Sequence, residues 1–271
     1  MAIERERLSP DTSVPKWVWL EHVARYEFGA RFVAGQVVVD CACGAGIGSE
    51  TFARNGAKSV AAFDVSESDL EAARRRMALP NLAFQRASGV ELPLTSSSVD
   101  VYISFETIEH VSEDHLFLRE VRRIVRPEGL FICSTPNRTV TNPGKAISDK
   151  PWNPFHVREY SHHEFVALLS EFFNEIVVYG QNPKPEWLAD SIGHLGRLLP
   201  LHGAVRLNQV MKLPQLVFDN LDRHAVQELI PGYAYEYLVA VCRGRRHGSS
   251  LTPRAAAPKM PHTQKEAQEA P

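Results

Sequence analysis

Short runs of β-branched and apolar residues alternate with helical patterns over the first half of the chain. The predicted strands are residues 37–40, 59–64, 82–86, 99–105 and 130–134, and helical patterns cover residues 49–54, 66–77 and 113–125. Because parallel strands need crossover connections, this alternation predicts a parallel sheet covered by helices on both faces. Apolar residues at three- and four-residue steps predict a further helix over residues 16–33.

The end of the pattern predicts an antiparallel hairpin. Ser161 and Glu164 have the spacing of a helix capping box, and strands are predicted at residues 175–179 and 235–243. We therefore expect an α/β, Rossmann-like fold with seven mostly parallel strands, helices on both faces, an antiparallel last strand and a helical insertion before it.

The domain organisation follows from shifts in composition. We expect a flexible N-terminus over residues 1–15, a single domain over 16–243 and a disordered tail over 244–271, which is poor in apolar residues. Within the domain, residues 182–230 are too long for a plain loop and have helical patches, so we expect an accessory or lid element. Leucines and prolines over residues 195–216 suggest either lid packing or peripheral contact with a lipid-linked acceptor.

Composition argues against several classes of protein. The 30 basic and 32 acidic side chains give a net charge of -2, so no basic field favours nucleic acid as a partner. No stretch approaches the roughly 18 apolar residues of a membrane span, and the N-terminus lacks the apolar core of a secretion signal. The cysteines form no CxxC pair and are expected to be reduced thiols of a cytoplasmic protein. They are Cys41, Cys43, Cys133 and Cys242.

The stretch VVVDCACGAGIGSE, residues 37–50, predicts a ligand-binding turn between the first strand and the next helix. The dinucleotide fingerprint GxGxxG is not met, because Gly44 and Gly46 are followed by Ser49 at the third position. Asp40, at the end of the strand, would repel a pyrophosphate and suits an ammonium group.

A second acid sharpens the interpretation of this turn. Asp64 ends the second strand, 20 residues after Gly44, where a carboxylate accepts hydrogen bonds from ribose hydroxyls. One acid suits an ammonium group and the next suits the hydroxyls of a ribose. This order predicts S-adenosylmethionine as the cofactor.

Several motifs, over about residues 20–181, resemble those of class I S-adenosylmethionine-dependent methyltransferases. DCACGAGIG and AAFDVSESDLEAAR resemble the first two motifs, ASGVELPL the loop that meets the adenine, VDVYISFETIEHV the fourth-strand motif, and FLREVRRIVRPEGLFICSTPNR the helix and strand that follow. The resemblance implies that the cofactor is bound by Asp40, Ala42, Cys43, Gly44, Gly46, Asp64, Val65, Ser88, Gly89, Ser104, Phe105 and Glu106.

Two positions depart from the family pattern. Ala42 replaces the usual first glycine of the turn, and Ser88 replaces a common adenine-contacting acid. Alanine still permits a close approach and serine still offers a hydrogen bond, so we expect altered affinity rather than lost binding.

A narrower resemblance bears on the acceptor. EHVARYEFGARFVAGQVVVDCACGAG, SFETIEHV, STPNR and NPFHVREYS together resemble bacterial small-molecule O-methyltransferases of glycan, glycolipid or natural-product biosynthesis, and ubiquinone-biosynthesis O-methyltransferases. The resemblance implies a small-molecule acceptor, methylated at a hydroxyl oxygen of a sugar, glycolipid or secondary metabolite.

The segment FETIEHV contains the first catalytic candidates. Glu106, Glu109 and His110 have the spacing of one side of a helical turn, at the sheet edge where α/β proteins bind ligands. Three roles stay open: His110 as a base oriented by a carboxylate, a divalent-metal site formed by the three residues as in the ExxEH pattern of the resembling ubiquinone enzymes, or a wall of the cofactor pocket.

His156, in a polar loop, is a second candidate base. We expect His110, His156 and Glu109 to be the catalytic residues, without a metal. Two other functions remain as alternatives, an NAD(P)-dependent oxidoreductase and a non-catalytic S-adenosylmethionine-binding scaffold. The sequence does not predict an oligomeric state.

Overall fold

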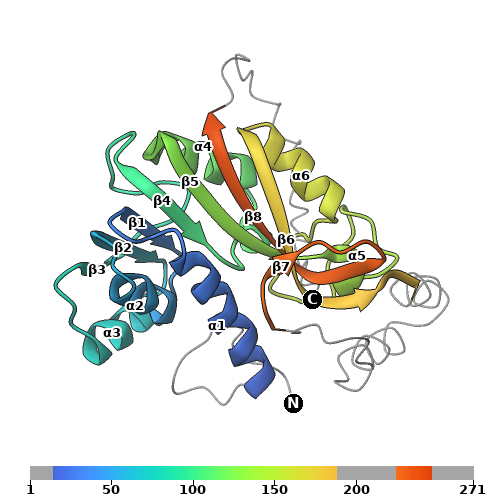
Figure 1. The fold of residues 1–271 in the computed structure, drawn as a ribbon, viewed down its shortest axis with the longest axis horizontal. Helices are drawn as coiled ribbons and strands as arrows, with labels where there is room; N and C mark the ends of the chain where they lie inside the picture. Colours follow the sequence, from blue (N-terminus) through green and yellow to red (C-terminus); the bar gives the residue numbers. More distant parts are fainter. Residues whose placement is uncertain (1–14, 188–223, 246–271) are drawn as a thin grey trace, which may run out of the picture.

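The computed structural model describes residues 15–187 and 224–245, and Figure 1 shows their fold. The strands are β1 (Val37–Cys41), β2 (Ser59–Asp64), β3 (Leu82–Arg86), β4 (Val99–Ser104), β5 (Val125–Pro136), β6 (Phe173–Pro185), β7 (Gln227–Glu228) and β8 (Tyr233–Arg245). The helices are α1 (Lys16–Ala30), α2 (Ile47–Arg54), α3 (Glu67–Arg76), η1 (Ile108–His110), α4 (Asp114–Ile124), α5 (Arg138–Thr141) and α6 (His162–Ser170).

The described strands form one sheet in the order β3-β2-β1-β4-β5-β8-β6-β7. From β3 to β5 every neighbouring pair is parallel, whereas β8 lies antiparallel between β5 and β6. The predicted fold class, a mostly parallel Rossmann-like sheet with an antiparallel last strand, is confirmed. The prediction of seven strands missed β7, which pairs with β6 only at Tyr179 and Gly180.

The antiparallel hairpin is longer than predicted. Strand β6 continues to Pro185 because residues 183–185 pair with residues 233–235 of β8. The strand therefore takes up the first residues of the segment expected to be an insertion. The rest of that segment, residues 188–223, and the predicted flexible ends 1–14 and 246–271 lie outside the described residues.

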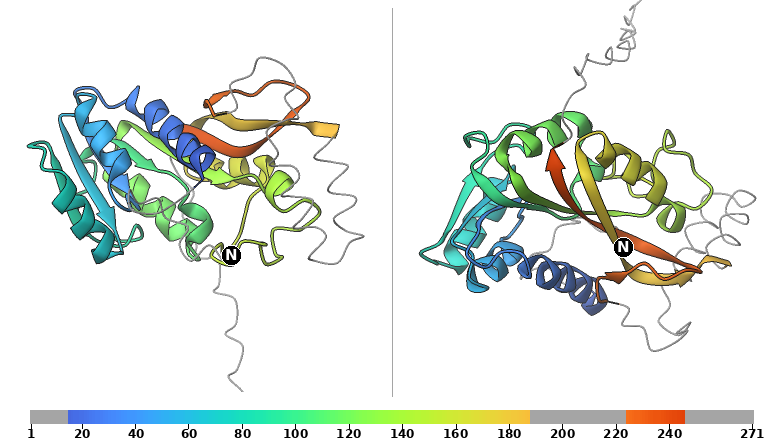
Figure 2. Two further views of the ribbon diagram at one scale, coloured as in Figure 1. Left: turned by 90° about the horizontal axis from the view of Figure 1, so that it is seen from below. Right: turned by 45° about the horizontal axis from the view of Figure 1, so that its top comes forward.

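Helices cover both faces of the sheet (Figure 2). Side chains alternate between faces along each strand, so Val38 packs with Phe28 of α1 and Phe52 of α2, while Val39 packs with Phe117 of α4 and Phe165 of α6. All six side chains are buried. Burial on both faces explains why β1 reads as a continuous apolar run.

The carboxyl ends of the parallel strands meet at one edge of the sheet. Here β1, β2, β4 and β5 end, and the antiparallel strand β8 begins. The turn after β1, the residues after β2, the segment containing η1 and the loop of residues 142–161 start from or run along this edge. In open α/β sheets this is the edge that binds ligands, and it contains the candidate site.

Candidate functional site

The turn after β1 has the backbone of a glycine turn, including at Ala42. Ala42, Gly44 and Gly46 have φ angles of 61, 53 and 76°. At Gly46 a Cβ atom would lie 2.7 Å from the ring of Phe84, so glycine is needed there for space as well as for conformation. Ala42 adopts the left-handed conformation with a side chain present, which costs about 1–2 kcal/mol. The departure from the family motif therefore produces backbone strain rather than a rearranged turn.

Asp40 is a buried acid beside this turn. Its Oδ2 atom accepts a hydrogen bond of 2.5 Å from Ser49 Oγ, at the start of α2. Burial raises the pKa of Asp40 to about 7, the hydrogen bond from Ser49 opposes the rise, and the charge of Asp64 adds to it. A Cβ atom on Gly48 would lie 2.8 Å from the ring of Tyr26, so this ring of α1 covers the turn. An approaching cation would favour the ionised form of Asp40.

Asp64 is held by backbone amides at the end of β2. Gly44 N donates to its Oδ2 atom and Ser66 N donates to its Oδ1 atom, each at 2.8 Å. These bonds fix the plane of the carboxylate, and each oxygen has a second lone pair for a further donor. The side chain of Val65, the next residue, is exposed. Asp64 thus ends β2, as predicted, with its carboxylate fixed beside the glycine turn.

The remaining candidate cofactor residues lie along the same edge. Ser104 Oγ donates to Cys41 O at 3.1 Å, joining the ends of β4 and β1. A Cβ atom on Gly89 would lie 2.9 Å from Cys41 Sγ, so the loop after β3 packs closely on β1. The rings of Phe105 and Tyr26 are 6.2 Å apart. Cys43 in the turn is buried, and Ser88 forms an isolated bridge with Glu91.

Glu106 and Glu109 do not share a side of a helix. Glu106 has a φ of 50° and precedes η1, which begins only at Ile108. Its Oε1 atom accepts from Ser134 Oγ at 2.6 Å, while Glu109 Oε2 accepts from Thr135 Oγ1 at 3.1 Å. Successive residues of β5 point to opposite faces, so the two carboxylates approach this strand from different faces, although the charge of Glu106 still acts on Glu109. The metal site considered from the sequence, Glu106 with Glu109 and His110, is therefore not the cluster that the structure forms.

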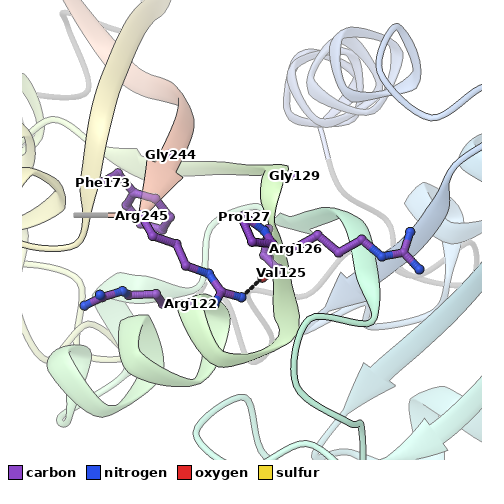
Figure 3. Close-up of a pocket in the computed structure, with 8 residues that line it drawn as sticks. All are labelled: Arg122, Val125, Arg126, Pro127, Gly129, Phe173, Gly244 and Arg245. Atoms are coloured by element: carbon purple, nitrogen blue, oxygen red, sulfur yellow. Dashed lines mark hydrogen bonds between the residues drawn. The ribbon is translucent and has the colours of Figure 1, made fainter. Parts of the chain in front are cut away.

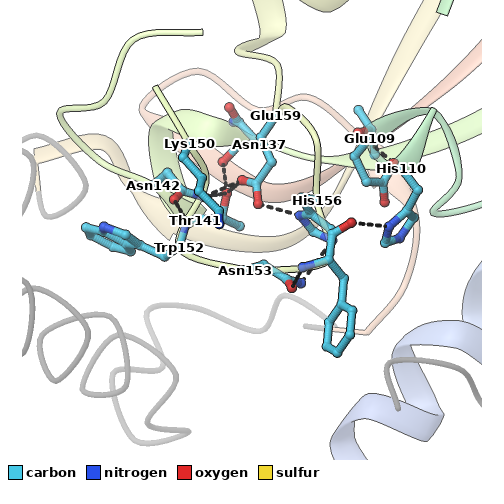
Figure 4. Close-up of polar contacts among 12 residues, drawn as sticks. Glu109, His110, Asn137, Thr141, Asn142, Lys150, Trp152, Asn153, His156 and Glu159 are labelled. Atoms are coloured by element: carbon cyan, nitrogen blue, oxygen red, sulfur yellow. Dashed lines mark hydrogen bonds and ion pairs between the residues drawn. The ribbon is translucent and has the colours of Figure 1, made fainter. Parts of the chain in front are cut away.

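The cluster that forms contains Glu109, His110 and His156. One ligand atom from each of these residues lies within 4.8 Å of the others. The rings of His110 and His156 meet edge to face at 4.8 Å, and His110 Nδ1 lies 3.0 Å from Phe155 O (Figure 4). Glu109 O accepts from Val157 N at 2.8 Å, which holds the loop containing His156 against η1.

The carboxyl group of Glu109 is completely buried. Its Oε1 atom has no hydrogen-bond partner among the described residues. Burial raises the pKa of Glu109 well above its usual range, the charge of Glu106 adds to the rise, and His156 opposes it. In this environment a proton or a divalent cation would compensate the charge.

Glu159 is a functional candidate that the sequence interpretation missed. His156 Nδ1 lies 2.6 Å from Glu159 Oε1, and both side chains are buried. Glu159 Oε2 accepts hydrogen bonds from Asn142 Nδ2 at 2.6 Å and from Thr141 Oγ1. Figure 4 shows this chain of contacts from the end of α5 to His156. The spacing of three residues between His156 and Glu159 was a signal in the sequence that could have suggested the pair.

A small pocket lies elsewhere, at the opposite edge of the sheet (Figure 3). It is lined by Arg122, Val125, Arg126, Pro127, Gly129, Phe173, Gly244 and Arg245. These residues surround the start of β5 and the end of β8, where Arg245 Nη2 donates to Val125 O. The pocket contains none of the candidate cofactor or catalytic residues.

Comparisons with known proteins find similarity to methyltransferases. Residues 39–133 match a family model described as a methyltransferase domain. The chain is 35% identical over 169 residues to a Mycobacterium tuberculosis protein named "Probable S-adenosylmethionine-dependent methyltransferase", an alignment that covers 62% of this chain and only 60% of that relative. It is 34% identical over 120 residues to a ubiquinone biosynthesis O-methyltransferase of Mesorhizobium japonicum, covering 44% of this chain and 48% of that relative.

Solved structures show the same fold. The structure of an S-adenosylmethionine-dependent methyltransferase from Mesorhizobium loti superposes with a TM-score of 0.51 at 18% sequence identity. The superposition covers 83% of this chain and 100% of the Mesorhizobium loti chain. By motif order, fold and sequence matches, the chain is similar to class I S-adenosylmethionine-dependent methyltransferases. The cofactor of this family is S-adenosylmethionine, as the two acids predict. Within the described residues, no helix is long and apolar enough to cross a membrane.

Proposed function

We propose that the protein transfers a methyl group from S-adenosylmethionine to a hydroxyl oxygen of a small-molecule acceptor such as a sugar, a glycolipid or a secondary metabolite. One observation carries this proposal. The acids Asp64 and Asp40, at the ends of β2 and β1, lie on the same sheet edge as the cluster of Glu109, His110 and His156 beyond β4. Cofactor and proton-transfer groups thus occupy neighbouring parts of one site.

The residues at the first end of this edge fit the cofactor. Asp40, a buried acid whose pKa is raised to about 7, would be stabilised in its ionised form by an ammonium group. Asp64 presents an oriented carboxylate suited to two ribose hydroxyls. We propose that the other contacts come from the turn, the loop after β3 and the end of β4, at Ala42, Cys43, Gly44, Gly46, Val65, Ser88, Gly89, Ser104, Phe105 and Glu106.

The residues at the second end fit proton transfer. S-adenosylmethionine supplies an electrophilic methyl carbon, and a hydroxyl acceptor must lose its proton as it reacts. His110 and His156 each have an imidazole group at this end. Burial favours the protonated form of Glu109, so we propose that it orients neighbouring groups rather than removing the proton.

The same cluster supports a second mode of catalysis. Two imidazole groups are ligands that suit a divalent transition metal, as is a buried carboxylate oxygen to which no described residue donates a hydrogen bond. Methyl transfer that is lost after dialysis against a chelator and restored by one divalent cation would favour this mode over metal-free catalysis.

We also propose a cytoplasmic location. All four cysteines are buried and free, which is consistent with a reducing compartment. Contact with a lipid-linked acceptor would involve residues 195–216, which lie outside the described residues.

The function is tested with the purified protein, methyl-labelled S-adenosylmethionine and a cell extract, with the labelled product identified by mass spectrometry. We expect a small molecule labelled on oxygen. Binding of NADH at micromolar concentration without binding of S-adenosylmethionine would contradict the proposal and favour an oxidoreductase. Binding of S-adenosylmethionine without transfer to any extract would favour a non-catalytic scaffold.

A further inference from the structure

A chain of polar contacts fixes the tautomer of His156. An ionised carboxylate only accepts hydrogen bonds, so Glu159 Oε1, 2.6 Å from His156 Nδ1, requires the proton to be on Nδ1. The other ring nitrogen, Nε2, then carries the lone pair. Asn153 Nδ2 lies 3.0 Å from Nε2 and donates to it. The ring is thus held with its basic nitrogen facing a hydrogen-bond donor.

The carboxylate of Glu159 is itself held in place. Its second oxygen accepts from Asn142 Nδ2 at 2.6 Å and from Thr141 Oγ1, both at the end of α5. Asn142 also accepts from Trp152 N at 2.6 Å through its Oδ1 atom, which ties the same loop to α5. Glu159 is 2% exposed, so its charge is little screened by solvent.

His110 has a different contact within the cluster. Its Nδ1 atom faces the carbonyl oxygen of Phe155 at 3.0 Å, and its side chain is exposed. A neutral carbonyl stabilises an imidazolium ion less than a buried carboxylate does. The buried contact with Glu159 therefore favours His156 as the base.

We propose that Glu159 is a positioning residue that makes His156 the general base, and that the acceptor group is a hydroxyl donating to His156 Nε2 in the place of Asn153. This inference rests on the proposed methyl transfer. The acceptor O–H bond breaks with its proton going to Nε2, the oxygen forms a bond to the methyl carbon, and the electron pair of the broken C–S bond stays on sulfur. Glu159 stabilises the imidazolium ion, which then loses its proton to solvent.

The side chain of Asn153 indicates the kind of acceptor. An amide N–H and a hydroxyl O–H are both neutral donors of similar reach, so a hydroxyl can replace the amide without leaving Nε2 unpaired. A neutral amine acceptor already has a lone pair and needs no base before attack. A carboxylate-supported imidazole therefore selects an acceptor that must be deprotonated.

The proposal is tested with Glu159→Gln, with Glu171→Gln as the matched control. Glu171 also faces a histidine, since its Oε2 atom lies 3.3 Å from His115 Nε2, but both of these side chains are exposed. In the free protein, nitrogen NMR should show His156 protonated on Nδ1, with a hydrogen-bonded proton that is lost in Glu159→Gln and retained in Glu171→Gln. This readout does not require the acceptor.

Methyl transfer to the acceptor fraction used by the wild-type protein gives the second readout. We expect Glu159→Gln to lower kcat by roughly 10²- to 10⁴-fold, to move the acid limb of its pH profile, and to leave the Kd for S-adenosylmethionine unchanged. Asn153→Ala should retain the Nδ1 proton and should transfer methyl groups at least tenfold faster than Glu159→Gln. It serves as the second variant if Glu159→Gln is unstable.

Different results would contradict this inference and the proposed function. A wild-type protein that neither binds S-adenosylmethionine nor transfers a methyl group would contradict the function itself. If the wild-type protein is active and the pH profile of kcat is the same in Glu159→Gln, the role of Glu159 is overturned. Two results would overturn the assignment of Nε2 as the basic atom. One is a proton on Nε2 in the wild-type protein, and the other is an Asn153→Ala variant that is as inactive as His156→Ala.

Discussion

The two ends of the candidate site are built in different ways. At the cofactor end, Asp40, Ala42 and Gly44 lie within one strand and its turn, and Asp64 joins them through a hydrogen bond to Gly44 N. At the acceptor end, His110 follows β4, whereas His156 comes from a loop beyond β5 and meets it ring to ring. The first end is therefore mostly local in sequence, and the second depends on packing between distant segments.

This difference has a physical consequence. The cofactor end relies on backbone conformation and backbone N–H groups, which tolerate little change of dihedral angle. The acceptor end relies on side chains whose positions depend on two hydrogen bonds, one that Asn142 Nδ2 donates to Glu159 and one that Val157 N donates to Glu109 O. Variants at the cofactor end should mainly change binding and stability, and variants at the acceptor end should mainly change turnover.

The largest effect is expected at the acceptor end. His156→Ala should lower kcat by roughly 10²- to 10⁴-fold, because general base catalysis typically contributes that much, while the Kd for S-adenosylmethionine changes little. His110→Ala should have a smaller effect on kcat. Steady-state kinetics and calorimetry measure the two quantities, with the exposed His163→Ala as a control. Equal losses in kcat and cofactor affinity would instead place His156 in the wall of the cofactor pocket.

The second effect is a pH dependence at the cofactor end. Burial raises the pKa of Asp40 from 3.8 to about 7, so between these values the folded protein keeps a proton that the unfolded chain has lost. The contribution of Asp40 to the free energy of unfolding should therefore be greatest below about pH 4. It should fall by up to about 4 kcal/mol as the pH rises toward about 7. Asp40→Asn should remove this dependence, as measured by chemical denaturation between about pH 4 and 7.

A control distinguishes this group from the other acids. Asp100 pairs with Arg126 near the start of β4, far from the turn, and Asp100→Asn should leave the fall in stability between about pH 4 and 7 in place. A wild-type protein that becomes more stable over that range, with no difference in Asp40→Asn, would contradict the raised pKa.

Asp64→Ala should have the third largest effect. Loss of the ribose hydrogen bonds is expected to weaken S-adenosylmethionine binding by roughly 1 to 3 kcal/mol, with some loss of stability because Gly44 N and Ser66 N lose their acceptor. Calorimetric titration measures the affinity, and the exposed Glu71→Ala in α3 is the control. An unchanged Kd would refute the ribose role.

The contrast between the two ends also explains what the sequence could predict. The positions of Asp40 and Asp64 could be predicted from the ends of predicted strands, because a strand end, a glycine turn and an acid are local features. The alternation of elements likewise predicted the parallel part of the sheet. By contrast, no local pattern required Glu159 to meet Asn142, or His156 to meet His110, since those contacts depend on how the loop folds over η1.

The longer hairpin was missed for a related reason. Residues 182–185 contain two prolines, which disfavour a strand in a sequence pattern. The pairing of Pro183 and Pro185 with β8 shows that contacts between distant segments override this local preference. Grouping Glu106 with Glu109 was similarly an assumption of helical geometry, whereas η1 begins two residues after Glu106.

The smallest expected effect tests the local character of the cofactor end. Ala42 has a φ of 61°, so Ala42→Gly removes about 1–2 kcal/mol of backbone strain but makes the unfolded chain more flexible. The net result should be a gain in unfolding free energy of about 0.5–1 kcal/mol, measured by chemical denaturation. Ala45, in the same turn, is not among the positive-φ residues of the structure, so Ala45→Gly should destabilise by a similar amount. If both variants lose stability equally, the strain at Ala42 is absent. Backbone conformation would then not fix the cofactor end, and the proposed difference from the acceptor end would be wrong.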